Sequence, residues 1–141
     1  MNRRYAIRCA IALTFTFGWA CGSDAVAGPV IVTSVAGTWK LTAVNSLPLP
    51  FIVSASDPKL EVIDKQYVIS AANTFTTSYT LRATELDGTV STGTVTDSGT
   101  LTLADNTVTF TYKSDGSIVL ATVTPTSMTI NSGNVQDFAK Q

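Results

Sequence analysis

The chain has 141 residues, enough for one domain, and it contains no histidine, the side chain most used for acid–base catalysis near neutral pH and for metal binding. From Cys21 onward it carries six basic and ten acidic residues, a net charge of −4, and Arg82 is the only arginine among them. Because phosphate contacts require clustered positive charge, this composition argues against nucleic-acid binding.

Residues 1–20 have the organisation of a secretory signal peptide, for which we expect a helix. Arg3, Arg4 and Arg8 supply the positive start, and residues 9–20 form an uncharged apolar run. Twelve residues are too few to cross about 30 Å of hydrocarbon as a helix, which argues against a membrane anchor. The Arg3-Arg4 pair leaves a twin-arginine signal open, although Ala6 stands where such signals place a large apolar residue.

The end of this segment resembles the lipobox of bacterial lipoproteins, in which a cysteine becomes the lipidated first residue of the mature chain. Ala20 and Cys21 match that pattern, whereas Gly18 and Trp19 depart from it. The resemblance implies lipidation of Cys21 and an exported protein held on a membrane of the bacterial cell envelope. The alternative is ordinary cleavage after residues 25–27 (Ala-Val-Ala), which would release a periplasmic or secreted protein starting at Gly28.

Residues 21–34 are interpreted as a flexible tether, and residues 35–141 as the folded domain. The first strand is predicted over residues 37–43, where Trp39, Leu41 and Ala43 alternate with polar residues. Pro48 and Pro50 end it, because proline cannot donate to a central ladder. Residues 51–59 are expected to form a loop across one end of the sheet, either as a lid or as packing.

Short threonine-rich strands separated by tight turns fill the rest of the chain, which has 21 threonines and 13 serines after Cys21. Whether residues 60–63 and 66–70 are two strands or one bent strand stays open. Residues 97–99 (Asp-Ser-Gly) suggest a bulge or bend inside the strand that follows Gly88. The pattern predicts an all-β, up-and-down antiparallel barrel of eight to ten strands, with an immunoglobulin-like sandwich as the alternative. The other expected strands cover residues 74–83, 89–103, 107–112, 117–124, 127–130 and 135–140.

Residues 37–39 (Gly-Thr-Trp) resemble the Gly-x-Trp motif of lipocalins, and the sequence from Val35 to Lys140 is similar to small bacterial lipocalin-like lipoproteins. The resemblance implies that Lys140 crosses the indole of Trp39 beside Gly37 and closes the barrel end. Lipocalins use arginine there, and residues 96–98 (Thr-Asp-Ser) lack the tyrosine of their Thr-Asp-Tyr motif. The chain is also shorter than a typical lipocalin, which leaves open whether the interior is hollow or filled.

A small hydrophobic ligand is the partner that such a barrel would take, and inward-facing aromatic residues are the candidates for lining its site: Trp39, Phe75, Tyr79, Phe110 and Tyr112. Core packing of the same residues is the competing interpretation. Small inward residues near the mouth (Ala43, Thr77 and Ala83) would leave room for a ligand, whereas close packing of the aromatic rings would not. A filled barrel would instead be a structural or interaction protein, such as an inhibitor or scaffold, with a protein partner that the sequence does not identify.

No catalytic motif, metal site or cofactor site is evident, and we expect a protein that is not an enzyme. The remaining cysteine, Cys9, leaves with the signal peptide, so no disulfide is expected. Arg82 is expected on a solvated face. Four aspartates stand at turn positions, where they are ordinary hairpin residues, and a hydrolase with paired carboxylates is the weakest alternative: Asp87, Asp97, Asp105 and Asp115.

Overall fold

The computed structural model describes Gly28 and residues 30–141. The expected signal helix, the candidate lipidation site Cys21 and most of the expected tether lie outside the described residues. Ten strands make up the secondary structure of the described part, in which no helix occurs. Their bounds are β1 Gly37–Val44, β2 Leu47–Pro48, β3 Phe51–Ser54, β4 Lys59–Ile69, β5 Thr74–Thr84, β6 Val90–Ala104, β7 Thr107–Tyr112, β8 Ile118–Val123, β9 Ser127–Asn131 and β10 Val135–Lys140.

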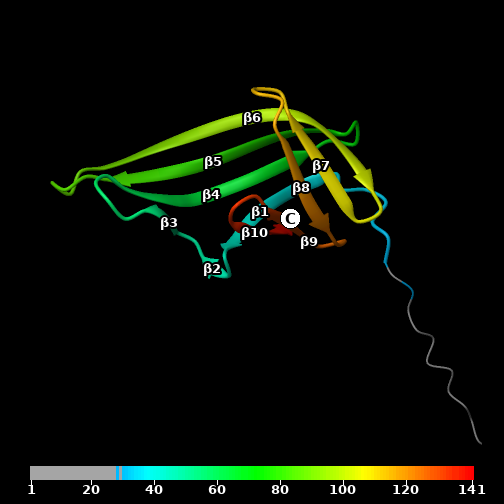
Figure 1. Cartoon of the computed structure of the whole chain (residues 1–141), viewed down its shortest axis with the longest axis horizontal. Helices are drawn as coiled ribbons and strands as arrows, with labels where there is room; N and C mark the ends of the chain where they lie inside the picture. Colours follow the sequence, from blue (N-terminus) through cyan, green and yellow to red (C-terminus); the bar gives the residue numbers. More distant parts are fainter. Residues whose placement is uncertain (1–27, 29) are drawn as a thin grey trace, which may run out of the picture.

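Eight of these strands form a closed antiparallel barrel (Figure 1). Strands β4 to β10 pair in chain order, and β1 closes the ring by pairing with β10 on one side and β4 on the other. The prediction of an all-β up-and-down barrel is confirmed. Tight turns between neighbouring strands account for this order, because each hairpin places its two strands side by side.

Three strands are much longer than the others. Strands β4 and β5 have 11 residues each and β6 has 15, whereas β7 to β10 have five or six. Figure 1 shows β4, β5 and β6 extending as a curved sheet past the rest of the barrel. We call this extension the overhang and define it as residues 59–65, 79–84 and 90–95, which are joined by the β4–β5 and β5–β6 pairings.

The barrel opens where β1 and β4 diverge. These strands pair only through Gly37–Lys40 and residues 66–69, whereas β4 and β5 pair over nearly their full length. Beyond Lys40, β1 turns back through Asn45 and Ser46 to pair with β2, and β3 pairs with the start of β4. Both turn residues have positive φ (50° and 64°), as a two-residue hairpin of the primed type requires. We call the gap between the diverging strands the fork.

Strand β6 begins to pair with β7 at Gly99, within the Asp-Ser-Gly sequence where a bulge or bend is predicted, and its pairing with β5 shows no register shift there. Gly99 pairs with Phe75 on β5 and with Tyr112 on β7. A Cβ atom there would lie 2.0 Å from the Thr111 carbonyl oxygen and 2.8 Å from the Phe75 ring. A side chain at position 99 is therefore excluded by the close approach of β7 and the core.

Three local expectations differ from the structure. Residues 51–59 were expected to form a loop, but their first four residues form β3, which pairs with β4, and Lys59 already begins β4. Ala43 is only half-buried and Val44 is buried instead, because the β1–β10 register shifts after Leu41. The packed domain also starts before Val35, since Val32 is 7% exposed within the residues interpreted as a tether. The side chain of Asn106 holds this segment by accepting a hydrogen bond from Val32 N (2.9 Å) and donating one to Val30 O (2.9 Å).

Candidate functional site

One half of the barrel interior is filled by aromatic side chains. Tyr67, Phe75, Phe110 and Phe138 pack with ring centroids 5.0 to 5.8 Å apart, and Tyr112 lies 5.1 Å from Phe75. The only polar atoms of these rings meet each other, because the Tyr67 and Tyr112 hydroxyls are 2.6 Å apart. Burial raises the pKa of both phenols. This part of the interior is a packed core.

The end of the barrel beyond this core is closed around Trp39, which is fully buried. Its indole Nε1 donates to Val35 O (2.8 Å), and Lys140 Nζ lies 5.3 Å from the ring centroid. Gly37, at φ 131°, lets the Lys140 chain pass, since a Cβ would lie 3.0 Å from Lys140 Cε. The three residues proposed to close the barrel are therefore in contact.

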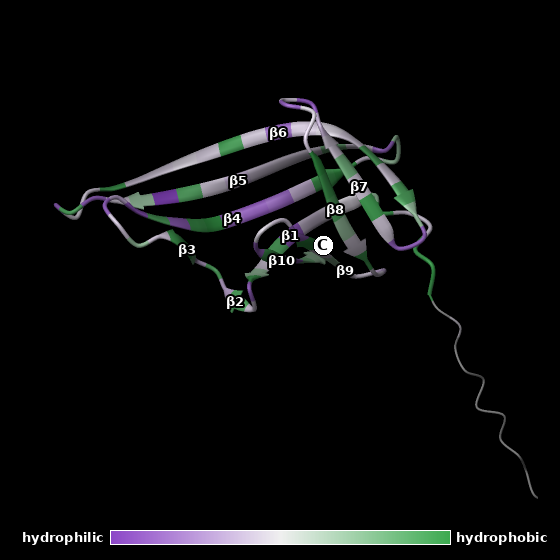
Figure 2. Ribbon diagram, in the orientation of Figure 1, coloured by the Kyte–Doolittle hydropathy of each residue, from purple (hydrophilic) through white to green (hydrophobic). Residues whose placement is uncertain are grey.

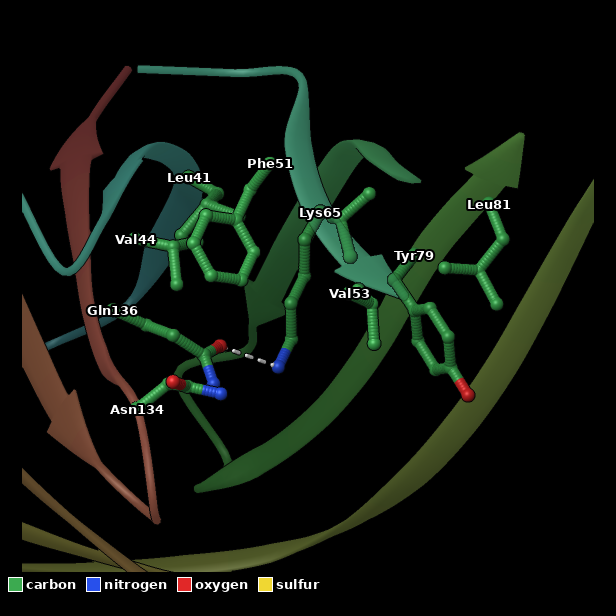
Figure 3. A pocket seen from close by; sticks show the side chains of 10 residues that line it. Leu41, Val44, Phe51, Val53, Lys65, Tyr79, Leu81, Asn134 and Gln136 are labelled. Carbon is green, nitrogen blue, oxygen red and sulfur yellow. Dashed lines mark hydrogen bonds between the residues drawn. The ribbon is translucent and has the colours of Figure 1, made fainter. Parts of the chain in front are cut away.

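A pocket of about 310 Å³ occupies the fork (Figure 3). Seven of its ten lining residues are apolar or aromatic, and the polar ones are Lys65, Asn134 and Gln136. Figure 3 shows Lys65 crossing the middle of the pocket between Phe51 and Tyr79. The lining combines both sides of the fork with the overhang: Leu41, Val44, Phe51, Val53, Val62, Lys65, Tyr79, Leu81, Asn134 and Gln136.

The five aromatic residues predicted to line a ligand site are spread over different places. Tyr79 lines the fork pocket, while Trp39 and Phe110 are fully buried away from it. Phe75 and Tyr112 border a second, more open depression of about 490 Å³, where β5, β6 and β7 meet around Gly99. Of the small residues expected at the mouth, Thr77 is buried and donates a hydrogen bond to Gln66 O (3.0 Å).

The residue that sequence reasoning missed is Lys65. Figure 2 shows a hydrophilic band in the middle of the long strand β4, where Asp64, Lys65 and Gln66 follow one another. Lys65 alternates with Tyr67 and Ile69 and so shares their inward face, and the register shift between Val62 and Asp64 brings Val62 to the same face. The alternation of Lys65, Tyr67 and Ile69 is visible in the sequence and was the available signal.

Lys65 reaches from β4 across the fork to β10. Its Nζ donates to Gln136 Oε1 (2.8 Å) and lies 5.5 Å from the Tyr67 centroid and 6.0 Å from that of Phe138. Desolvation by burial lowers the pKa of Lys65 from 10.5 to about 8. Lys65 takes part in none of the ion pairs between described residues. The pocket thus contains one partly desolvated amine and no carboxylate.

Several other charged residues are paired outside the pocket or hydrogen-bonded in turns. Arg82 Nη2 pairs with Glu61 at 2.8 Å and Lys59 Nζ pairs with the same carboxylate at 2.9 Å. Hydrogen bonds from Lys59 and then Arg82 lower the pKa of Glu61. Asp87 and Asp115 accept bonds from the backbone of their own turns, which lowers the pKa of each.

Within residues 30–141 and at Gly28, no group of three or more metal-ligating side chains comes together. The same part of the chain contains no helix of the length and apolarity needed to cross a membrane. Comparisons of the chain with protein-family models, curated proteins and solved structures found no significant match.

Proposed function

We propose that this chain is an exported, lipocalin-like lipoprotein of the bacterial cell envelope that binds a small apolar ligand in the fork pocket. The observation that carries the binding role is the pocket itself, whose largely apolar lining includes a few convergent polar groups. Ligand sites in proteins combine these features, and the smallest of them have volumes of about 300 Å³. The export and anchoring parts rest on residues 1–21 and are tested separately.

The packed aromatic core limits where a ligand can sit. Tyr67, Phe110 and Phe138 are at most 2% exposed and occupy the space that a deep calyx would need. A ligand therefore rests at the mouth, between β1 and the overhang, with Phe51 and Val53 of β3 over one side. This restricts the candidates to small or single-chain molecules.

Binding is tested by filling the pocket from its wall. Leu81→Trp places a large ring on the lining, and Thr80→Trp places the same ring on the opposite face of β5. We expect native mass spectrometry of protein purified from a bacterial host to show a co-purified apolar molecule, which L81W loses and T80W keeps. An unliganded protein that also fails to take up an apolar fluorescent probe would contradict the proposal.

Anchoring is tested on the full-length chain in the same host. We expect intact-mass analysis to show a diacylated or triacylated terminus at Cys21, and Cys21→Ser to move the protein from the membrane to the soluble fraction. A chain that begins at Gly28 without added lipid would instead make it a periplasmic or secreted protein.

One observation favours the second candidate function, a protein-interaction module. Strand β6 pairs with β7 only from Gly99 to Ala104, so its first half has a partner on one side only, β5. The free edge over residues 90–96 carries no charge and no proline, which are the usual protections of an edge strand. Thr94→Pro would interrupt the addition of a partner strand at this edge. If T94P loses a protein that co-purifies with the unmodified chain but keeps the small ligand, the result would favour this role.

A further inference from the structure

Lys65 is placed where an apolar ligand would end. Along β4 the inward residues run from Val62 in the overhang, through Lys65, to the buried Tyr67. The amine therefore lies at the inner end of the pocket, next to the rings of Tyr67 and Phe138. The apolar residues Val53 and Leu81 lie farther out. The inner side of the pocket thus holds the amine together with the buried Leu41 and Val44, and the more exposed Val53 lies at its mouth.

The cation at the floor has no internal counter-ion. The titratable side chains lining the pocket are Lys65 and Tyr79. The carboxylates closest in sequence to Lys65 are engaged elsewhere, Asp64 with Lys40 (3.6 Å) and Glu61 with Lys59 and Arg82. Asp137, which follows Gln136, accepts a hydrogen bond from the hydroxyl of Thr129 (2.9 Å). A partly desolvated ammonium whose one hydrogen-bond acceptor is a neutral amide is poorly compensated. A bound anion would supply the missing charge.

We propose that the pocket takes a single-chain amphiphile bound head-first, with a carboxylate on the Lys65 ammonium and an alkyl chain along the apolar wall. This inference rests on the proposed ligand-binding function and names the class of ligand. Gln136 contributes to head-group binding, because its Oε1 already accepts from Lys65 and its Nε2 therefore presents N–H donors beside the ammonium. One cation and one amide match a singly charged head group better than a dianionic phosphate.

The free protein already holds this amine mostly protonated. With a pKa of about 8, roughly nine-tenths of Lys65 is charged at pH 7. A carboxylate bound to it stabilises the charged form, so ligand binding raises the pKa of the amine. Affinity for the carboxylate should therefore decline as the pH rises through about 8, while affinity for a neutral ligand of the same length should not change.

The experiment compares decanoate with decanol on protein purified from bacteria that express the full-length chain and then delipidated by a mild organic wash. At pH 6.5 we expect decanoate to bind about tenfold or more tightly than decanol, the size of a hydrogen bond to a charged group. Lys65→Met should bring decanoate down to the affinity of decanol and leave decanol itself unchanged. Lys113→Met, which removes an exposed lysine near the β7–β8 turn, is the matched control and should change neither affinity.

The outcomes separate this inference from the function on which it rests. Equal binding of decanoate and decanol would overturn the carboxylate inference and keep the apolar pocket. Binding of neither molecule would count against both. A preference for decanoate that K65M retains would place the anion elsewhere, and tighter binding of decyl phosphate than of decanoate would overturn the choice of head group. A rise in the NMR-measured pKa of Lys65 on adding decanoate is the direct positive result.

Discussion

The two halves of this barrel are built from the same antiparallel strands but differ in role: one half is a packed core and the other contains the fork pocket. In the closed half, the short strands, the segment before β1 and the inner ends of β4, β5 and β6 surround a core of aromatic rings, and Trp39 and Lys140 cover its end. In the open half, three long strands run on without the rest of the ring, and β1 and β4 part to leave the fork pocket. We therefore expect the closed half to contribute most of the free energy of unfolding and the open half to bind the ligand.

The largest difference between the halves is expected from truncating one ring in each. Phe110→Ala removes a fully buried ring that contacts Tyr67 and Phe75, and should lower the free energy of unfolding by about 3–5 kcal/mol. Tyr79→Ala removes a half-buried ring from the pocket wall and should cost about 1 kcal/mol. Urea titrations followed by Trp39 fluorescence measure both, and equal losses would contradict the division.

A second contrast lies within one strand, because β6 carries a glycine in each half. A methyl group at Gly99 would collide with the Thr111 carbonyl and the Phe75 ring, whereas one at Gly93 meets nothing within 4 Å. Gly99→Ala should therefore cost about 2–3 kcal/mol through overpacking, and Gly93→Ala less than about 0.5 kcal/mol. The same urea titrations provide the measurement, and a neutral G99A would show that β7 can move away.

The closed half was the more predictable of the two. The expected bounds of β7 and β10 are those observed. These features are local, since alternation and turn residues determine them. The filled core was an open alternative that sequence could not decide, because it depends on how rings from β4, β5, β7 and β10 meet.

The open half depends on non-local geometry. The parting of β1 and β4 follows from the β1–β2 hairpin at Asn45 and Ser46, which sequence reasoning took as the end of a strand. The register shift between Val62 and Asp64 places Val62 on the same face as Lys65 within a single strand, where the sequence left two strands or one bent strand open. The inward face of Lys65 follows from local alternation with Tyr67 and Ile69, but the pocket around it could not be predicted without knowing which strands separate.

The pH dependence of stability tests whether Lys65 is buried without a counter-ion. Its pKa is about 8 in the folded protein and 10.5 in the unfolded chain, so between these values the unfolded chain binds more protons and stability rises with pH. The rise should amount to roughly 1–3 kcal/mol and be absent in Lys65→Met. Above about pH 10 the raised pKa values of Tyr67 and Tyr112 act in the opposite direction. Urea titrations at pH 7, 8, 9 and 10 on both proteins isolate the lysine, and parallel curves would show that a carboxylate already compensates it.

The smallest effect is expected at the barrel end, where Lys140 lies over the Trp39 indole at 5.3 Å. Lys140→Met keeps the length and apolar stem of the side chain but removes the charge, so the expected loss is the cation–π term alone, about 0.5–1 kcal/mol. Lys113→Met removes an exposed charge near the β7–β8 turn at the other side of the barrel and should be neutral. Urea titrations at 0.05 and 0.5 M salt then distinguish the causes: a contact with the ring face persists at high salt, whereas a general effect of net charge is screened and would make the two variants alike. Lys65→Met and Lys140→Met thus remove one lysine from each end, and only the first should change what the protein binds.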